Sequence, residues 1–295
     1  ELLADPWGRR IHDNFQSGEE GRAEAFRMLM EATFTGVDPM ESEDAVRSIW
    51  QEFVEKAETY NEPGVFSAMT GFEWTSSPDG NNLHRVIIQR DGADKTSQTI
   101  PFSLFNSPDP QDLWSYLEDY EEKTGGKLLA IAHNGNLSNG WMFPTEKTYH
   151  GGEVDKEYVT QRARREPHYE ITQTKDDGEA HPTLSPDDEF ADYENWSFGN
   201  LDLSEIKTPD MLKGEYGREA LKRGLQLEKK FGINPYQFGM IGSTDAHTAI
   251  SSIEENNFFG KHSGVEPEPH RWEHVVISSP LDPDLTVYGW QQASS

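Results

Sequence analysis

Short apolar runs that alternate with amphipathic segments constrain the fold of this chain most strongly. Residues 43–60, 110–122 and 217–231 repeat apolar side chains at the helical period. The runs with the length and composition of strands are 65–75, 83–90, 127–133, 169–174, 236–243 and 274–279. Strands that alternate with helices predict an α/β fold with a mainly parallel sheet, either open or closed into a barrel.

The chain of 295 residues is long enough for one large α/β domain or two small ones. It has neither an internal repeat nor a long linker. We therefore interpret residues 1–295 as a single domain. A polar stretch around 150–210, part of which is acidic and contains proline, is interpreted as an insertion.

The composition excludes several kinds of site and partner. Lys and Arg number 26 and Asp and Glu 53, so the net charge of −27 disfavours nucleic-acid binding. Without cysteine, any metal must bind through imidazole and carboxylate, which suits Zn, Mn or Fe. We find no apolar run as long as a membrane span and no signal peptide in the given residues. The compartment, bacterial cytoplasm or periplasm, and the oligomeric state are left open.

Residue types that bind metals follow three of the predicted strands. Glu73 follows one apolar run, His133 another, and Asp245 with His247 a third. The carboxyl ends of strands form the functional face of α/β sheets and barrels. Asp245 and His247 are two apart, so in extended backbone they face the same side. His84 lies eleven residues after Glu73, across a predicted hairpin. The pattern indicates a metal site at one end of the sheet.

Each of these residues also has a simpler interpretation. His84 could be a solvated edge residue, and His133 a buried neutral histidine with a backbone partner. Asp245 could cap a helix, and Glu73 could form a salt bridge with Arg85. The coincidence of these residue types at several strand ends favours the metal site.

A group of basic residues stands out in this acidic chain. Arg164 and Arg165 are followed by Lys175 and His181 within one segment. Such cations could hold a phosphate or sulfate group, although a solvated basic turn explains them equally well. Asn134, after His133, could donate to substrate oxygens. The sequence thus predicts a small anionic substrate.

Four motifs carry a resemblance to a known group of proteins: GFEW at 71–74, NLHR at 82–85, AHN at 132–134 and GSTDAH at 242–247. They resemble the later motifs of the polymerase and histidinol phosphatase (PHP) superfamily of metallophosphoesterases. Within it, the chain is similar to the family catalogued as domain of unknown function 3604. That similarity extends to residues 166–170, 173–175, 178–182 and 255–261 and covers most of 65–275.

The resemblance implies a distorted seven-stranded β/α barrel with two or three divalent metal ions. Its ligands would be Glu73, His84, His133, Asp245 and His247. It implies a metal-dependent hydrolase of phosphate esters or related anionic esters, in which a metal-activated water attacks. His181 or His247 would protonate the leaving group, and His247 cannot do so while it is a ligand.

The chain departs from the superfamily pattern at its start. The early His-x-His and Asp-His motifs are absent, and Asn134 replaces a proline. We therefore expect a barrel that is incomplete at the N-terminus and lacks some of its metal ligands. Two alternatives stay open: a sulfatase-type or other ester hydrolase on the same site, and a catalytically incomplete metal-binding or structural module.

Overall fold

The computed structural model describes residues 2–40, 42–250, 254–257, 259–262, 270, 273, 275–282 and 284–288. The chain divides into two compact units. Unit 1 comprises Glu1–Ser76 and Arg85–Ile131, and unit 2 comprises Ser77–His84 and Ala132–Ser295. Strand β3 (Leu128–His133) is shared, because its last two residues belong to unit 2.

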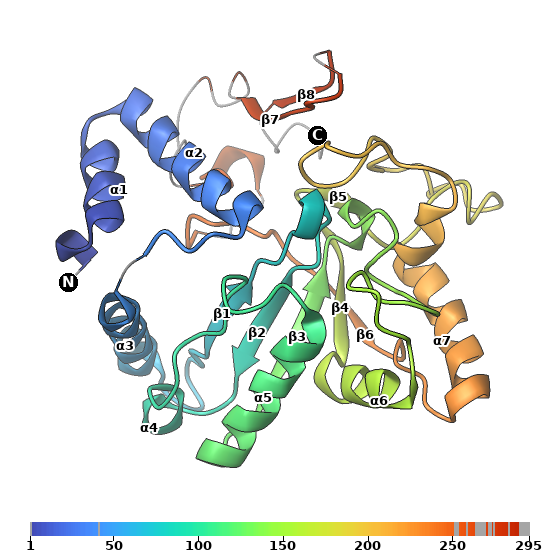
Figure 1. Ribbon diagram of the computed structural model, residues 1–295, viewed down its shortest axis with the longest axis horizontal. Coiled ribbons are helices and arrows are strands. Elements are labelled where there is room, and N and C mark those ends of the chain that lie inside the picture. The colour runs from blue at the N-terminus through green and yellow to red at the C-terminus, as the bar shows by residue number, and fades with distance from the viewer. Residues whose placement is uncertain are drawn as a thin grey trace. The chain divides into compact units, whose positions relative to one another are not determined.

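Unit 1 combines helices with an antiparallel strand pair. The helices are α1 (Pro6–Gln16), α2 (Glu19–Thr35), α3 (Glu43–Tyr60), α4 (Ala93–Thr96) and α5 (Pro110–Thr124), and the strands are β1 (Thr70–Trp74) and β2 (Arg85–Gln89). Helices α1 and α2 pack against each other (Figure 1). The aspartates at positions 5 and 109 cap α1 and α5, each before a proline that suits the first helical turn. The predicted helices at 43–60 and 110–122 are confirmed.

The register of the hairpin in unit 1 matters for the site. Strands β1 and β2 are antiparallel, with Glu73 opposite Val86 and Trp74 opposite Arg85. Because β1 ends where β2 begins, the residue that precedes β2 in the chain, His84, is at the end of the hairpin where β1 ends. The buried side chains of Trp74 and Arg85 stack there, with the guanidinium carbon 5.9 Å from the ring centroid.

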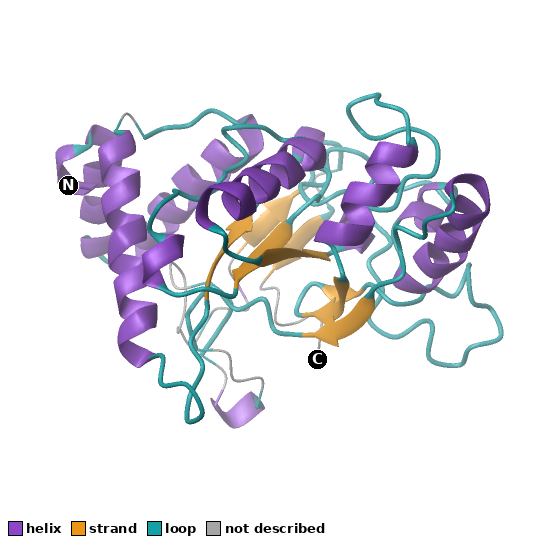
Figure 2. Cartoon of the chain, turned by 90° about the horizontal axis from the view of Figure 1, so that it is seen from below, coloured by secondary structure: helices purple, strands orange, loops and turns teal. Residues whose placement is uncertain are grey.

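Unit 2 contains the helices α6 (Lys156–Arg165) and α7 (Gly217–Phe231) and the strands β4 (His168–Gln173), β5 (Asp176–Asp177), β6 (Gly239–Gly242), β7 (Val275–Ser278) and β8 (Thr286–Tyr288). Helices α6 and α7 contact each other (Figure 1). The predicted helix at 217–231 is confirmed. The predicted strand at 236–243 is shorter than expected, and His274 of the last one lies outside the described residues. Figure 2 shows that loops form a large part of the chain.

The sheet corrects one expectation. Its strands follow the order β1-β2-β3-β4-β5, and β6 pairs with β4. Strand β4 is parallel to β6 but antiparallel to β5, and β1 is antiparallel to β2, so the sheet is mixed rather than mainly parallel. The described residues form no closed barrel, so the expected seven-stranded barrel is not confirmed. The alternation of strands and helices indicated the α/β class but not the strand directions.

Among the described helices, none combines the length and the apolar character that a bilayer crossing requires.

Candidate metal centre

Two buried histidines of unit 2 lie next to each other. His84 directly precedes β2, and His133 is the last residue of β3. The backbone N–H of His133 donates to the carbonyl of His84 at 3.4 Å, and the two rings lie edge to face with centroids 5.6 Å apart. One ring nitrogen of His84 lies within 4.8 Å of a ring nitrogen of His133. The Oγ of Ser77 is 2.8 Å from Nε2 of His84 and helps to orient that ring.

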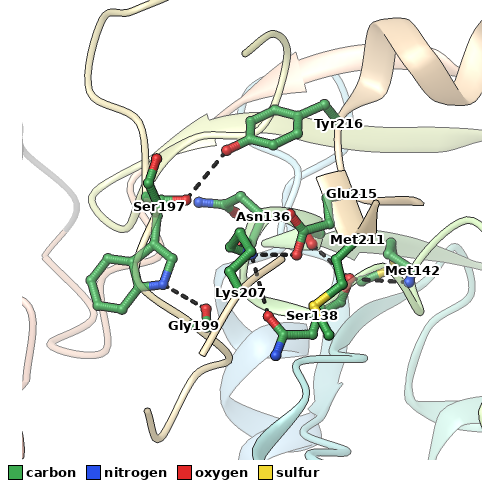
Figure 3. A network of polar contacts seen from close by, with 12 residues as sticks. Asn136, Ser138, Met142, Ser197, Gly199, Lys207, Met211, Glu215 and Tyr216 are labelled. Carbon is green, nitrogen blue, oxygen red and sulfur yellow. Dashed lines mark hydrogen bonds and ion pairs between the residues drawn. The ribbon is translucent and has the colours of Figure 1, made fainter. Parts of the chain in front are cut away.

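The loop that follows His133 is held by a buried polar network (Figure 3). Lys207 donates to the backbone oxygen of Asn136 at 2.8 Å and forms an ion pair with Glu215. Burial lowers the pKa of Lys207 and raises that of Glu215 to about 7, while the attraction between the two charges opposes both shifts. Backbone N–H groups of Asn139 and Gly140 also donate to Glu215. The network therefore fixes the backbone of the residues that follow His133 in the chain.

Asp245 is the most strongly stabilised carboxylate of the site. Lys175 lies 2.5 Å and Lys261 2.6 Å from its Oδ2, and all three side chains are buried. Burial by itself raises the pKa of the Asp245 carboxyl, but the two lysine charges outweigh it and hold the pKa well below its usual value. Asp245 is thus an anion at neutral pH, as a metal ligand must be.

His247 lies on the same loop as Asp245, with its Nε2 3.1 Å from Oδ1 of that carboxylate. Its backbone N–H donates to the carbonyl of Lys261, and its ring lies 4.8 Å from that of His262. Burial and the neighbouring positive charges lower the pKa of His262 well below its usual value. Lys261 and His262, which lie outside the predicted strands, thus contact the loop that contains Asp245 and His247.

Glu170 is a buried carboxylate for which the sequence predicted no role. It lies in the middle of β4 and is 8% exposed. Burial, the largest effect, raises its pKa, while His133 opposes the rise and Asp245 adds to it. Glu170 therefore interacts with both histidine and aspartate candidates of unit 2. A carboxylate in the middle of a short, mostly uncharged strand was the signal that could have indicated it.

The predicted substrate-binding residues occupy different places. Lys175 contacts Asp245, and Asn134 accepts a hydrogen bond from Gln173 at 2.7 Å. Arg164 is exposed and Arg165 buried at the end of α6, before β4, whereas Lys175 follows β4. Because a strand of this length spans roughly 17 Å, the two arginines and Lys175 do not form one cationic patch.

The predicted catalytic histidine His181 contacts Ser197 and Tyr216. Its Nε2 is 3.3 Å from Oγ of Ser197, its Nδ1 accepts from the backbone N–H of Thr183, and its ring is 5.3 Å from that of Tyr216. Burial and the charge of Lys207 lower its pKa. In the part of the chain that the structure describes, its contacts are with these residues and not with the ligand candidates.

Glu73 belongs to the other compact unit. It is half-buried at the fourth position of β1, one residue before the strand ends. In the hairpin register it lies opposite Val86, one residue before the end of β1. Its role as a ligand to the same ion as the residues of unit 2 stays a prediction.

A family comparison identifies the chain. The model of the family described as Protein of unknown function (DUF3604) matches residues 2–295. The chain belongs to this family. No curated protein and no solved structure matches it. The similarity to DUF3604 expected from the motifs is therefore confirmed.

The donors of this DUF3604 chain suit a divalent ion. Groups of Glu, His and Asp side chains that could hold a metal are present, and their members within unit 2 are His84 with His133 and Asp245 with His247. We call these four residues the unit 2 ligand set. Imidazole and carboxylate donors favour Zn, Mn or Fe. The residues fit such an ion, and its identity and number stay predictions.

Proposed function

We propose that this DUF3604 chain is a metal-dependent hydrolase of phosphate esters or related anionic esters. The observation that carries the proposal is the unit 2 ligand set, which gathers two buried imidazoles and an ionised, buried carboxylate beside two buried lysines. Strongly perturbed charged groups of this kind concentrate at functional sites. The sequence motifs add Glu73 to this set as a further predicted ligand.

A bound divalent ion would acidify water and neutralise the charge that develops on the ester's oxyanion. The residues of the chain have separate tasks. Lys175 and Lys261 provide positive charge that attracts an anionic group. His247, whose side chain is 41% exposed, is accessible enough to protonate a leaving group when it is not itself a ligand.

The placement in the PHP superfamily belongs to the same proposal. It rests on the spacing of Glu73, His84, His133, Asp245 and His247. A site of two or three ions is a further prediction of that placement.

The test combines metal analysis with a substrate screen. The purified chain is dialysed with Zn²⁺, Mn²⁺ or Fe²⁺, its metal content is measured, and chromogenic phosphomonoesters, phosphodiesters and sulfate esters are offered. His133→Ala is compared with His12→Ala, which changes a histidine on α1. We expect metal-dependent phosphoester hydrolysis that His133→Ala lowers by at least about 100-fold and His12→Ala leaves unchanged.

The outcomes separate the alternatives. Turnover of sulfate esters alone would assign a sulfatase-type hydrolase to the same site. Bound metal without turnover of any ester would identify a binding or structural module. A chain that takes up no metal would contradict the proposal altogether.

A further inference from the structure

Glu170 occupies the strand between the two halves of the unit 2 ligand set. Strand β4 neighbours β3, which ends at His133, and pairs with β6, which precedes Asp245. Glu170 is opposite Ile241 of β6, and the β4–β6 register shifts immediately afterwards, before Thr172. Such a bulge redirects side chains and is frequent next to active sites. The fold therefore places a carboxylate centrally among residues that come from distant parts of the chain.

The side chain of Glu170 is held in place but only partly satisfied. Gln173 forms a hydrogen bond with its carboxylate, and Nε2 of Gln173 donates to Oδ1 of Asn134 at 2.7 Å. Among the described residues, Oε1 of Glu170 is buried without a hydrogen-bond partner. Leaving a carboxylate oxygen buried and unsatisfied costs free energy unless a cation or a donor compensates it.

Lys175, the nearest candidate for a simple structural ion pair, has another partner. Its Nζ lies on Oδ2 of Asp245, where Lys261 also binds. It contributes a favourable charge to Glu170, but one weaker than that of His133. Among the charges that act on the pKa of Glu170, those of His133 and Asp245, two ligand candidates, have larger effects than that of Lys175. Glu170 is therefore electrostatically coupled to both ligand candidates.

We propose that Glu170 is a further metal ligand of the site, binding the same ion or ion cluster as His133 and Asp245. The proposal rests on the metal centre proposed above. It adds a carboxylate from β4 to the ligands that follow β3 and β6. Gln173 is then a positioning residue that orients Glu170 and connects it to the loop after His133, as second-sphere partners do in metal sites.

The test uses Glu170→Gln, which keeps the shape of the side chain and removes its charge. Glu179→Gln is the matched control, because Glu179 lies in the same unit but pairs with Arg218. Affinity for Mn²⁺ and Zn²⁺ is measured by calorimetry, and the visible spectrum of the Co²⁺-loaded protein reports the ligand set. Loss of an outer-sphere partner weakens metal binding about 10- to 100-fold, so loss of a direct ligand should weaken it at least about 100-fold.

We expect Glu170→Gln to weaken binding by this factor and to change the Co²⁺ spectrum, while Glu179→Gln does neither. Unchanged affinity and spectrum with loss of hydrolysis would overturn the ligand role and assign proton transfer to Glu170. If Glu170→Gln does not fold, Glu170→Ala, which removes the donor, replaces it, and an unaltered Co²⁺ spectrum would again overturn the proposal. A parent chain that binds no ion would instead refute the metal centre itself, so the two failures are distinguishable.

Discussion

Single residues at the site adopt a backbone conformation that few residue types tolerate. Asn134 and Asp245 have φ angles of 51° and 52°, in the left-handed region. Such a conformation costs on the order of 1 kcal/mol and persists only where the surroundings enforce it. Asn134 directly follows the ligand candidate His133, and Asp245 is itself a ligand candidate. Both lie where the chain has left a strand. The backbone strain therefore falls where the side chains must be aimed.

Asp245→Asn should destabilise the protein strongly. Asparagine tolerates the left-handed conformation, so the change mainly removes the charge that Lys175 and Lys261 share. Leaving buried charges without their partner costs about 3–5 kcal/mol. Urea denaturation in the absence of metal measures this loss, with Asp210→Asn, at an exposed position, as control. Equal midpoints for Asp245→Asn and its parent would contradict the interpretation.

Asp176 should make the stability depend on pH. Burial and the charges of Glu194 and Asp177 raise its pKa from 3.8 to about 7 in the folded protein. The folded chain then holds a proton that the unfolded chain releases between these pH values, so this group's contribution to stability falls as the pH rises from about 4 to 7.

Asp176→Asn should therefore be more stable than its parent by at least about 1 kcal/mol at pH 8. The difference should vanish near pH 3.5, where both states of the parent are protonated. Asparagine also suits the left-handed backbone of this position. Thermal denaturation across this pH range is the measurement, and a difference that does not change with pH would refute the assignment.

The sequence was informative for residues at strand ends and silent for those that reach the site through tertiary contacts. His133 and Asp245 could be predicted because each follows an apolar run. Lys261 could not, because its contact with Asp245 joins two loops. Glu170 was not predicted, because a buried carboxylate in the middle of β4 has no signal in the alternation of the strand.

At the scale of elements, the loop after β3 depends on the Lys207–Glu215 pair. Residues 135–137 form a short 3-10 helix whose Gly135 lies close to Tyr169, since the hydroxyl of Tyr169 accepts from its backbone N–H at 3.1 Å. A Cβ at Gly135 would lie 2.4 Å from the carbonyl oxygen of Glu215. Close approach of backbone segments therefore fixes this loop together with the ion pair.

Lys207→Met should cost about 3 kcal/mol or more, because it leaves Glu215 buried without its counter-charge. Adding Glu215→Gln to that variant should restore more than half of the loss, since glutamine keeps an acceptor for the N–H groups of residues 139 and 140. A double-mutant cycle in urea gives the coupling free energy. A double variant no more stable than Lys207→Met would show that charge is not what the pair contributes.

Elements with a strong apolar period were predictable, and charged ones were not. Helices α3, α5 and α7 matched their expected ranges closely. Helix α6 was not assigned, because its sequence KEYVTQRARR is dominated by polar and basic residues and its helix depends on the Asp155 cap and on buried side chains such as Arg162. Propensity alone does not report such tertiary support.

At the scale of the whole molecule, metal binding should stabilise the fold. A ligand that binds only the folded state adds about 2.7 kcal/mol at 100 times its dissociation constant. Zn²⁺ or Mn²⁺ at that excess should therefore raise the melting temperature by several degrees, and a chelator should reverse the rise. His133→Ala should show a smaller shift in the same scan. No shift in the parent at saturating metal would contradict the metal centre.

The strand order shows what a linear pattern cannot give. Periodicity indicated where strands occur, yet β1 with β2 and β4 with β5 run antiparallel. The direction of a strand depends on how the chain returns to the sheet, and neither connection contains a helix that would have to cross over. For this reason the α/β class could be predicted from the sequence, whereas the mixed topology of the sheet could not.

The long sequence separation within the unit 2 ligand set has a consequence for the order of events during synthesis. His84 leaves the ribosome far ahead of Asp245, and Lys261, one of the two lysines that contact Asp245, follows sixteen residues later. Until position 261 has emerged, the early histidines have no complete partner set, and the contacts between distant segments form last. A metal ion bound by the complete set would therefore be acquired only after position 261 has emerged.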